Sequence, residues 1–400
     1  MADEEGKNYL RWSDFKLSDS MYQKYHISLI LDTILNTGEV SRKSIADLTG
    51  LFRSTVTKYT RQMLEEKQLI PRTEVKNPFG PPEKLLQLNK EYQYGIGFSY
   101  SEVRDTYKVL ICDYTGNYVK HMEYKADFPN SYQTIITILK KIKTENTIAF
   151  SGITFNSRFF KSGYDKKIIY SGCSSKKPYV FFSNENLKEV SQILSSSVQF
   201  STESQAALIA ESWSMRGTSV KNTALIYSTH AIKTNQSYEI RFFIATARNG
   251  VITSTPNNQH EQFCIPCTVV LPGKIREKMI IIENIFKNAE THGYCDVVNV
   301  IIDKLTEMIT YLYGLTGATT IYLIGGIETD CYRTKMPLLI SKKLKKKKLN
   351  GINQIQIRYA VNMDEHVLYG LAINTLYSNY KYYLNHVFFN QYKNRNESTE

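Results

Sequence analysis

The chain has 400 residues, 42% of them hydrophobic and 22% charged, which is typical of a soluble globular protein with two or three domains. Its 50 Lys and Arg residues against 38 Asp and Glu give a formal net charge of +12, which favours an anionic partner such as nucleic acid but equally suits an AT-rich genome. No stretch reaches the roughly 18 apolar residues of a membrane span and no secretory signal is recognisable, so we expect a cytoplasmic protein that contacts no membrane.

The N-terminal region begins without a periodic pattern and then becomes helical. Residues 1–21 carry no hydrophobic periodicity and are expected to form a loose leader. From Tyr22 on, apolar side chains recur at helical spacing at Ile27, Ile30, Leu31, Ile34 and Leu35. This stripe predicts an amphipathic helix that ends before Gly38.

The next segment, VSRKSIADLTGLFRSTVTKYTRQMLEEKQLI, predicts two more helices joined by a short turn. Ser41 is a candidate N-cap, and Gly50 suits the left-handed turn that closes the first of these helices. The second helix is expected to begin at Arg53 or Ser54, with the apolar side chains of Val56, Tyr59 and Met63 on one face. Two helices with this spacing are typical of a helix-turn-helix.

The segment around this motif has the length of a winged domain. Residues 22–76 are expected to form a winged helix-turn-helix, and residues 77–90, which contain the sequence NPFGPPEKLLQLN, the end of its wing and a linker. Six side chains of the second helix lie off its apolar stripe and are predicted to face DNA: Arg53, Ser54, Thr55, Thr57, Lys58 and Arg61. Two on the preceding helix are predicted to assist at the phosphates: Arg42 and Lys43.

Double-stranded operator DNA is therefore the expected partner. Because helix-turn-helix proteins commonly read two-fold symmetric operators, we also expect a homodimer or a dimer of dimers. The alternative is a helix-turn-helix that contacts only other proteins.

After residue 91 the pattern becomes that of an α/β protein. Strands and helices alternate for about 290 residues, which predicts two α/β lobes. The first lobe is placed at 91–200 and opens with a hairpin, and the second is placed at 201–384, before a tail at 385–400. Helices are predicted at four internal places: Ser131–Lys143, Ser204–Met215, Ile275–Lys287 and Cys295–Leu315.

Six segments in this order resemble the ROK family, named for repressors, open reading frames and kinases. They are SRKSIADLTGLFRSTVTK, GPPEKLLQLN, the hairpin at Tyr94, ESQAALIAES, IYLIGGIE and DEHVLYGLAINTLY. The resemblance covers about residues 22–380 and is to the xylose-repressor and N-acetylglucosamine-repressor type. It implies a winged helix-turn-helix before an actin-like sugar-kinase core, with the C-terminal helix returning to the first lobe.

The chain departs from this family where the kinases bind ATP. The family's first phosphate turn reads Asp-Ile-Gly, and Ser99, Tyr100 and Ser101 stand at those positions. The segment that resembles the second, glycine-rich phosphate loop is YSTHAIKT, from Tyr227 to Thr234, and it contains no glycine. Such loops bind phosphate because glycines let several backbone N–H groups converge on one anion. We therefore expect neither ATP use nor enzymatic activity, and no cofactor.

The sugar-binding positions of the family are also altered. Glu203, in Thr-Glu-Ser-Gln, stands where the resemblance places the catalytic base of Asn-Asp-Ala-Asn. Asn156 lies in place of a sugar-contacting Pro-Gly, and Glu261 in place of a sugar-binding glutamate. These three residues are the predicted effector site, and a sugar or sugar phosphate is the expected effector.

Metal binding is not expected. The family's zinc-binding Cys-x-Cys-Gly-x-x-Gly-Cys run is absent, although HEQFCIPC offers His260, Cys264 and Cys267. The six cysteines are scattered, so an incidental pair in a reduced protein is favoured over a metal site.

Taken together, these patterns predict a DNA-binding transcriptional regulator. A repressor of carbohydrate-related genes with a catalytically degenerate ROK-type effector domain is favoured. The alternatives are a ROK sugar kinase with an appended DNA-binding domain and a regulator whose sensor no longer binds a sugar.

Overall fold

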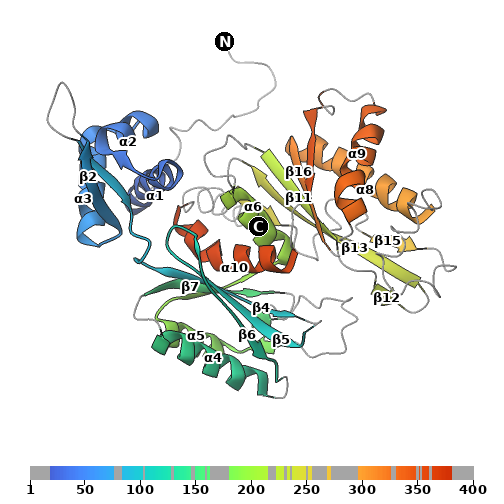
Figure 1. Cartoon of the computed structure of the whole chain (residues 1–400), viewed down its shortest axis with the longest axis horizontal. Helices are drawn as coiled ribbons and strands as arrows, with labels where there is room; N and C mark the ends of the chain where they lie inside the picture. Colours follow the sequence, from blue (N-terminus) through green and yellow to red (C-terminus); the bar gives the residue numbers. More distant parts are fainter. Residues whose placement is uncertain are drawn as a thin grey trace, which may run out of the picture. The chain divides into compact units, whose positions relative to one another are not determined.

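The computed structural model describes most of the chain in two compact units. The described residues are 19–75, 83–101, 104–127, 130–145, 149–157, 160–162, 180–214, 222–228, 232–234, 237–248, 251–254, 268–271, 296–325, 330–347, 351, 354–359 and 363–380. The first unit consists of Met1–Leu88 with Tyr380–Glu400, and the second extends from Asn89 to Asn379 (Figure 1). None of the helices in these ranges is long and apolar enough to cross a membrane.

The first unit contains three helices and a three-stranded antiparallel sheet. In chain order its elements are α1 (Asp19–Thr37), β1 (Val40–Ser41), α2 (Arg42–Thr49), α3 (Arg53–Glu65), β2 (Leu69–Val75) and β3 (Glu83–Leu88). The strand order is β1-β3-β2, with Val40 opposite Leu86 and Leu69 opposite Leu88. Three helices followed by a hairpin is the order of elements expected for a winged helix-turn-helix.

Local signals in the sequence set the ends of α2. The side chain of Ser41 accepts a hydrogen bond from the backbone N–H of Ser44 at 3.2 Å, which caps the N-terminus of α2. Gly50 adopts φ +71°, and its N–H donates to the carbonyl of Ala46 at 2.9 Å, which closes the C-terminus. The apolar faces of the three helices then meet in one core, with Ile30, Ile34, Ile45, Val56 and Met63 buried.

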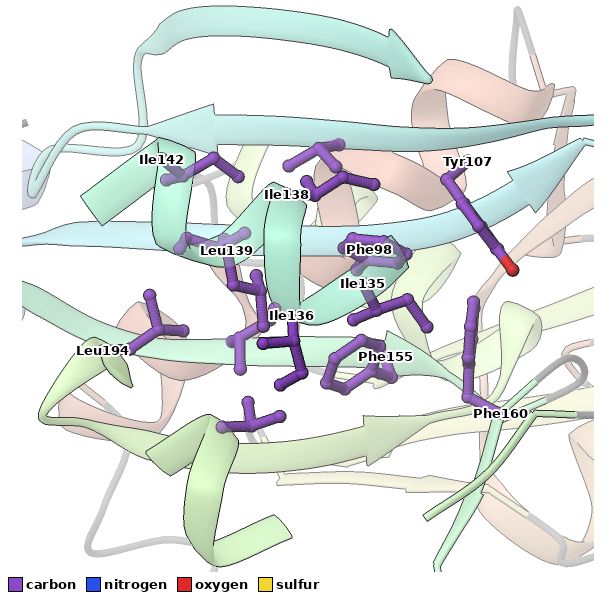
Figure 2. Close-up of a cluster of buried hydrophobic side chains, with 14 of the residues drawn as sticks. Phe98, Tyr107, Ile135, Ile136, Ile138, Leu139, Ile142, Phe155, Phe160 and Leu194 are labelled. Atoms are coloured by element: carbon purple, nitrogen blue, oxygen red, sulfur yellow. The ribbon is translucent and has the colours of Figure 1, made fainter. Parts of the chain in front are cut away.

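The second unit begins with a five-stranded sheet of order β10-β7-β4-β5-β6. Its strands are β4 (Tyr94–Ser101), β5 (Thr106–Cys112), β6 (Tyr118–Lys125), β7 (Phe150–Asn156) and β10 (Ser197–Ser201). Helices α4 (Ser131–Glu145) and α5 (Asn184–Leu194) cover one face, and Figure 2 shows their apolar side chains interleaved with those of the sheet. A short parallel pair, β8 (Phe160–Ser162) and β9 (Val180–Phe182), adds Phe160 and Phe182 to this core.

A second sheet follows, with the order β12-β13-β11-β16-β17. Its strands are β11 (Asn222–Ser228), β12 (Ile232–Thr234), β13 (Ser237–Arg248), β16 (Thr320–Gly325) and β17 (Gln356–Tyr359), and β14 (Val251–Ser254) and β15 (Thr268–Leu271) pair with β13. Helices α8 (Asp296–Thr316) and α9 (Asp330–Lys345) pack on this sheet through a second hydrophobic core. Each sheet therefore has its own core.

Two helices connect the sheets through close contacts at glycines. Helix α10 (Met363–Tyr380) lies so near β4 that a Cβ on Gly97 would be 2.5 Å from the carbonyl oxygen of Leu368. It also crosses α6 (Glu203–Ser214), where a Cβ on Gly370 would be 1.7 Å from the carbonyl oxygen of Ala206. Figure 1 shows α10 on the face of the first sheet opposite α4 and α5. These glycines allow the backbones to approach because they have no side chain.

The turn between β5 and β6 is fixed by Asp113. Its Oδ1 accepts hydrogen bonds from the backbone N–H groups of Thr115 and Asn117, both at 2.9 Å. Gly116 follows at φ +80°, and its carbonyl accepts a hydrogen bond from the hydroxyl of Tyr369 at 2.7 Å. The hairpin is thereby joined to α10.

Several sequence expectations differ in their limits from the structure. The helices predicted at Ser204–Met215 and Cys295–Leu315 are found at Glu203–Ser214 and Asp296–Thr316, and α5 and β10 were not predicted. The predicted helix Ile275–Lys287, most of the leader and the tail lie outside the described residues.

Candidate nucleic-acid interface and effector site

Helix α3 has one buried and one exposed face. Val56, Tyr59, Thr60 and Met63 are buried against the rest of the first unit. Of the side chains predicted to face DNA, Arg53, Ser54, Lys58 and Arg61 are exposed, and Thr55 and Thr57 are half-buried. The first turn of α3 begins Arg-Ser-Thr and contains no acidic side chain. The helix dipole and the basic side chains therefore both make the electrostatic potential at this end of the helix positive.

The two basic residues predicted on α2 have different surroundings. Lys43 is exposed. The Nε of Arg42, in contrast, donates a 2.8 Å hydrogen bond to Oγ1 of Thr60, a fully buried residue of α3. Arg42 therefore ties the two helices of the motif together, a role that its position in the sequence did not indicate.

We expect the Arg42→Ala substitution to destabilise the helix pair by about 1.5 kcal/mol, because a hydrogen bond from a charged donor is lost. Amide hydrogen exchange in α2 and α3 should become faster, which mass spectrometry of the full chain can measure. Lys43→Ala, an exposed change next to it, should alter the free energy of unfolding by less than about 0.5 kcal/mol. Equal exchange in the two variants would contradict this role of Arg42.

In the second unit, two of the three residues predicted to bind an effector lie together. The Nδ2 of Asn156, at the end of β7, is 3.4 Å from Oε1 of Glu203 and 3.1 Å from Oγ of Ser99 on β4. Asn156 is only 1% exposed, and the Glu203 side chain is half-buried. Three segments that are distant in sequence thus form one polar cluster, which we call the Asn156 cluster (Ser99, Asn156 and Glu203).

A capping box fixes the position of Glu203. The Oγ1 of Thr202 accepts a hydrogen bond from the backbone N–H of Gln205, and Oε1 of Gln205 accepts one from the N–H of Thr202, both at 3.2 Å. Glu203 is consequently the first residue of α6. A carboxylate at this end of a helix is stabilised by the helix dipole.

Further polar residues on the same sheet face were missed from the sequence. Lys108 is opposite Ser99 in the β4–β5 ladder, so its side chain leaves the sheet on the same face, and it is buried. The Nδ2 of Asn374 on α10 donates to Thr154 Oγ1 at 3.3 Å and to Gln199 Oε1 at 2.8 Å. The signal for Lys108 was a single charge inside the apolar strand TYKVLIC.

Several of the residues singled out in the sequence lie outside the described part of the chain. They are Glu261, His260, Cys264 and Cys267, together with Thr229 to Ala231 of the segment that resembles a phosphate loop. The residues that the structure describes contain no group of three His, Cys, Asp or Glu side chains arranged to hold a metal ion.

Solved structures with a similar fold come from the ROK family. A ROK family transcriptional regulator, a homolog of the E. coli MLC protein, has a TM-score of 0.62 at 14% identity and covers 90% of this chain and 98% of its own. An N-acetylmannosamine kinase candidate from Listeria monocytogenes has a TM-score of 0.50 at 15% identity and covers 70% and 98%. A ROK family protein from Streptococcus pneumoniae, in complex with sucrose, has a TM-score of 0.51 at 13% identity and covers 70% and 96%.

The sequence matches no protein-family model and no curated protein. Because the sequence identities are only 13% to 15%, the similarity to these structures establishes the fold alone. That fold is the one seen in ROK family proteins, and the predicted α/β class is confirmed.

Proposed function

We propose that this chain is a DNA-binding transcriptional regulator whose second unit is a sensor with a sugar-kinase fold. The observation that carries the proposal is the basic, exposed N-terminal half of α3 in a winged helix-turn-helix arrangement. Helix α3 would enter the major groove, and the hairpin of β2 and β3 would lie beside it.

The extent of the structural similarity supports a regulator. The ROK regulator covers 90% of this chain and the Streptococcus protein 70%, and the difference, 20% of 400 residues, is about 80 residues. The N-terminal segment of the first unit, which ends at Leu88, has about this length. A kinase has no need of a winged domain for phosphoryl transfer, whereas a regulator requires one to reach its operator.

The second unit is proposed to bind a small polyhydroxylated ligand without phosphorylating it. The Asn156 cluster contains the half-buried carboxylate of Glu203, whose oxygens can accept hydrogen bonds from sugar hydroxyl groups. A phosphate-binding turn needs exposed glycine backbone, whereas Ser99, Tyr100 and Ser101, at the place of that turn, are buried and paired with β5. Ligand binding would regulate transcription only if it favoured one arrangement of the chain over another.

The competing function is a sugar kinase, because kinases share the fold of the second unit. The deciding experiment combines two assays on the full chain. Selection from a random duplex library should enrich a specific DNA sequence, and coupled ADP release with ATP and a panel of sugars should show no turnover. Turnover without an enriched duplex would establish the kinase instead.

We expect Glu203→Gln to weaken binding of the effector about tenfold, because a hydrogen bond to a charged acceptor is worth about 1.5 kcal/mol. The effector would first be identified by thermal shift of the full chain with sugars and sugar phosphates, and its affinity measured by calorimetry. Glu307→Gln, an exposed change on α8, is the matched control and should leave the affinity unchanged. Equal affinities of the two variants would remove Glu203 from the site.

A further inference from the structure

The turn between α2 and α3 presents an aromatic side chain to solvent. Phe52 is 84% exposed, the highest value for a large hydrophobic residue in the part of the chain that the structure describes. Leu48, near the end of α2, is 64% exposed. Most of the other Phe and Tyr side chains in the described ranges are buried or half-buried, so the exposure of Phe52 is unusual for this protein.

The fold itself does not explain a phenylalanine at this place. Phe52 is the N-cap residue of α3 and provides no side-chain hydrogen bond to the first turn. Ser, Thr, Asp and Asn are preferred at N-caps because they do provide one. This chain uses such residues elsewhere: Ser41 caps α2 and Ser183 caps α5. Phe52 thus neither packs in the core nor caps its helix.

The helix-turn-helix that contains Phe52 has exposed basic side chains that suit a nucleic acid. Arg53 and Lys58 on α3 and Lys43 on α2 are exposed, and neither helix has an acidic residue in its first turn. An apolar side chain directly before the basic first turn of α3 complements a major groove that contains thymine, whose C5-methyl is the apolar group on the base edges there.

We propose that Phe52 reads DNA sequence by contact with the C5-methyl group of a thymine. The inference rests on the proposed DNA-binding function and assigns a specificity-determining residue within it. A recognition helix meets base edges with its N-terminal residues, and Phe52 immediately precedes the first residue of α3. Burying one methyl group against an aromatic ring strengthens binding about fourfold, so a symmetric dimer gains about 16-fold.

The test removes only the methyl group. A duplex is first selected from a random library with the full chain, and each thymine in it is then replaced by deoxyuridine. Fluorescence anisotropy gives the affinity for each duplex at one salt concentration. We expect one thymine in each half-site at which the wild-type chain loses about fourfold in affinity. The Phe52→Ser chain should bind the thymine and deoxyuridine duplexes equally.

Controls separate this effect from loss of fold and from loss of DNA binding. Phe52→Ser introduces a preferred N-cap, so its melting temperature should not fall. Leu338→Ser replaces another exposed apolar residue, 70% exposed on α9, and should keep the discrimination. Discrimination that persists in Phe52→Ser, or an enriched duplex without any methyl-sensitive thymine, overturns the inference and leaves DNA binding intact. No enriched duplex overturns both proposals.

Discussion

Replacing Arg53 and Lys58 together by alanine is expected to weaken binding of the selected duplex about 100-fold at physiological salt. Both side chains are exposed on the N-terminal half of α3. A base-edge contact in the major groove contributes about 1–3 kcal/mol to the free energy of DNA binding, and a phosphate contact adds a contribution that depends on salt concentration. The loss of one contact of each kind gives about 2.7 kcal/mol, which corresponds to 100-fold. Fluorescence anisotropy with the labelled duplex measures it.

A second double variant controls for net charge. Lys342 and Lys345 on α9 are also exposed, and their replacement by alanine removes the same two charges from the second unit. This change should weaken binding less than about threefold, because charges that do not contact DNA act only through a screened long-range field. Equal losses in the two double variants would contradict the docking of α3. A smaller dependence of affinity on salt concentration is expected for Arg53→Ala/Lys58→Ala alone.

The first unit could be predicted from the sequence because its signals are local. Ser41 caps α2 by accepting a hydrogen bond from Ser44, which is only three residues later in the chain, and Gly50 closes the same helix. The apolar stripe of α3 was visible as Val56, Tyr59 and Met63, and all three side chains are buried. The start of α3 remained ambiguous in the sequence because Phe52 is not a capping residue, and the structure places that start at Arg53.

Contacts between distant residues were harder to predict. Asn156 and Glu203 were chosen through a resemblance, but their contact depends on the register of β7 and on the capping box of α6. Arg42 was assigned to phosphate because a surface cation gives no sign of a buried acceptor 18 residues later. Helix α5 was missed although its sequence carries local signals: Leu187, Val190 and Leu194 recur at helical spacing, and Ser183 begins a capping box.

The glycines of the first strand illustrate the same limit. In the sequence, Gly95 and Gly97 precede the residues that stand at the position of the kinases' first phosphate turn, and nothing indicated a role for the two glycines themselves. In the structure a Cβ on Gly95 would be 2.1 Å from the carbonyl oxygen of Ala372. Both glycines are needed because α10 lies directly on β4. That helix begins more than 260 residues later, so nothing local could reveal the contact.

Gly370 gives the prediction with the largest effect on stability. A Cβ at this position would be 1.7 Å from the carbonyl oxygen of Ala206 and 2.4 Å from its carbonyl carbon. These are backbone atoms of α6, so they cannot rotate away as a side chain can, and the two helices must separate. Since Glu203 is in the first turn of the same helix, a shift of α6 also moves its carboxylate away from Asn156.

We therefore expect Gly370→Ala to lower the free energy of unfolding by about 3 kcal/mol, which corresponds to a fall in melting temperature of about 5 °C. Circular dichroism of the full chain measures it. Gly314→Ala is the matched control, because Gly314 lies in α8 with no atom within 4 Å of its Cβ position. Alanine there should stabilise the helix by about 0.5–1 kcal/mol. If Gly370→Ala melted at the temperature of the parent chain, α6 and α10 could not cross as closely as the structure places them.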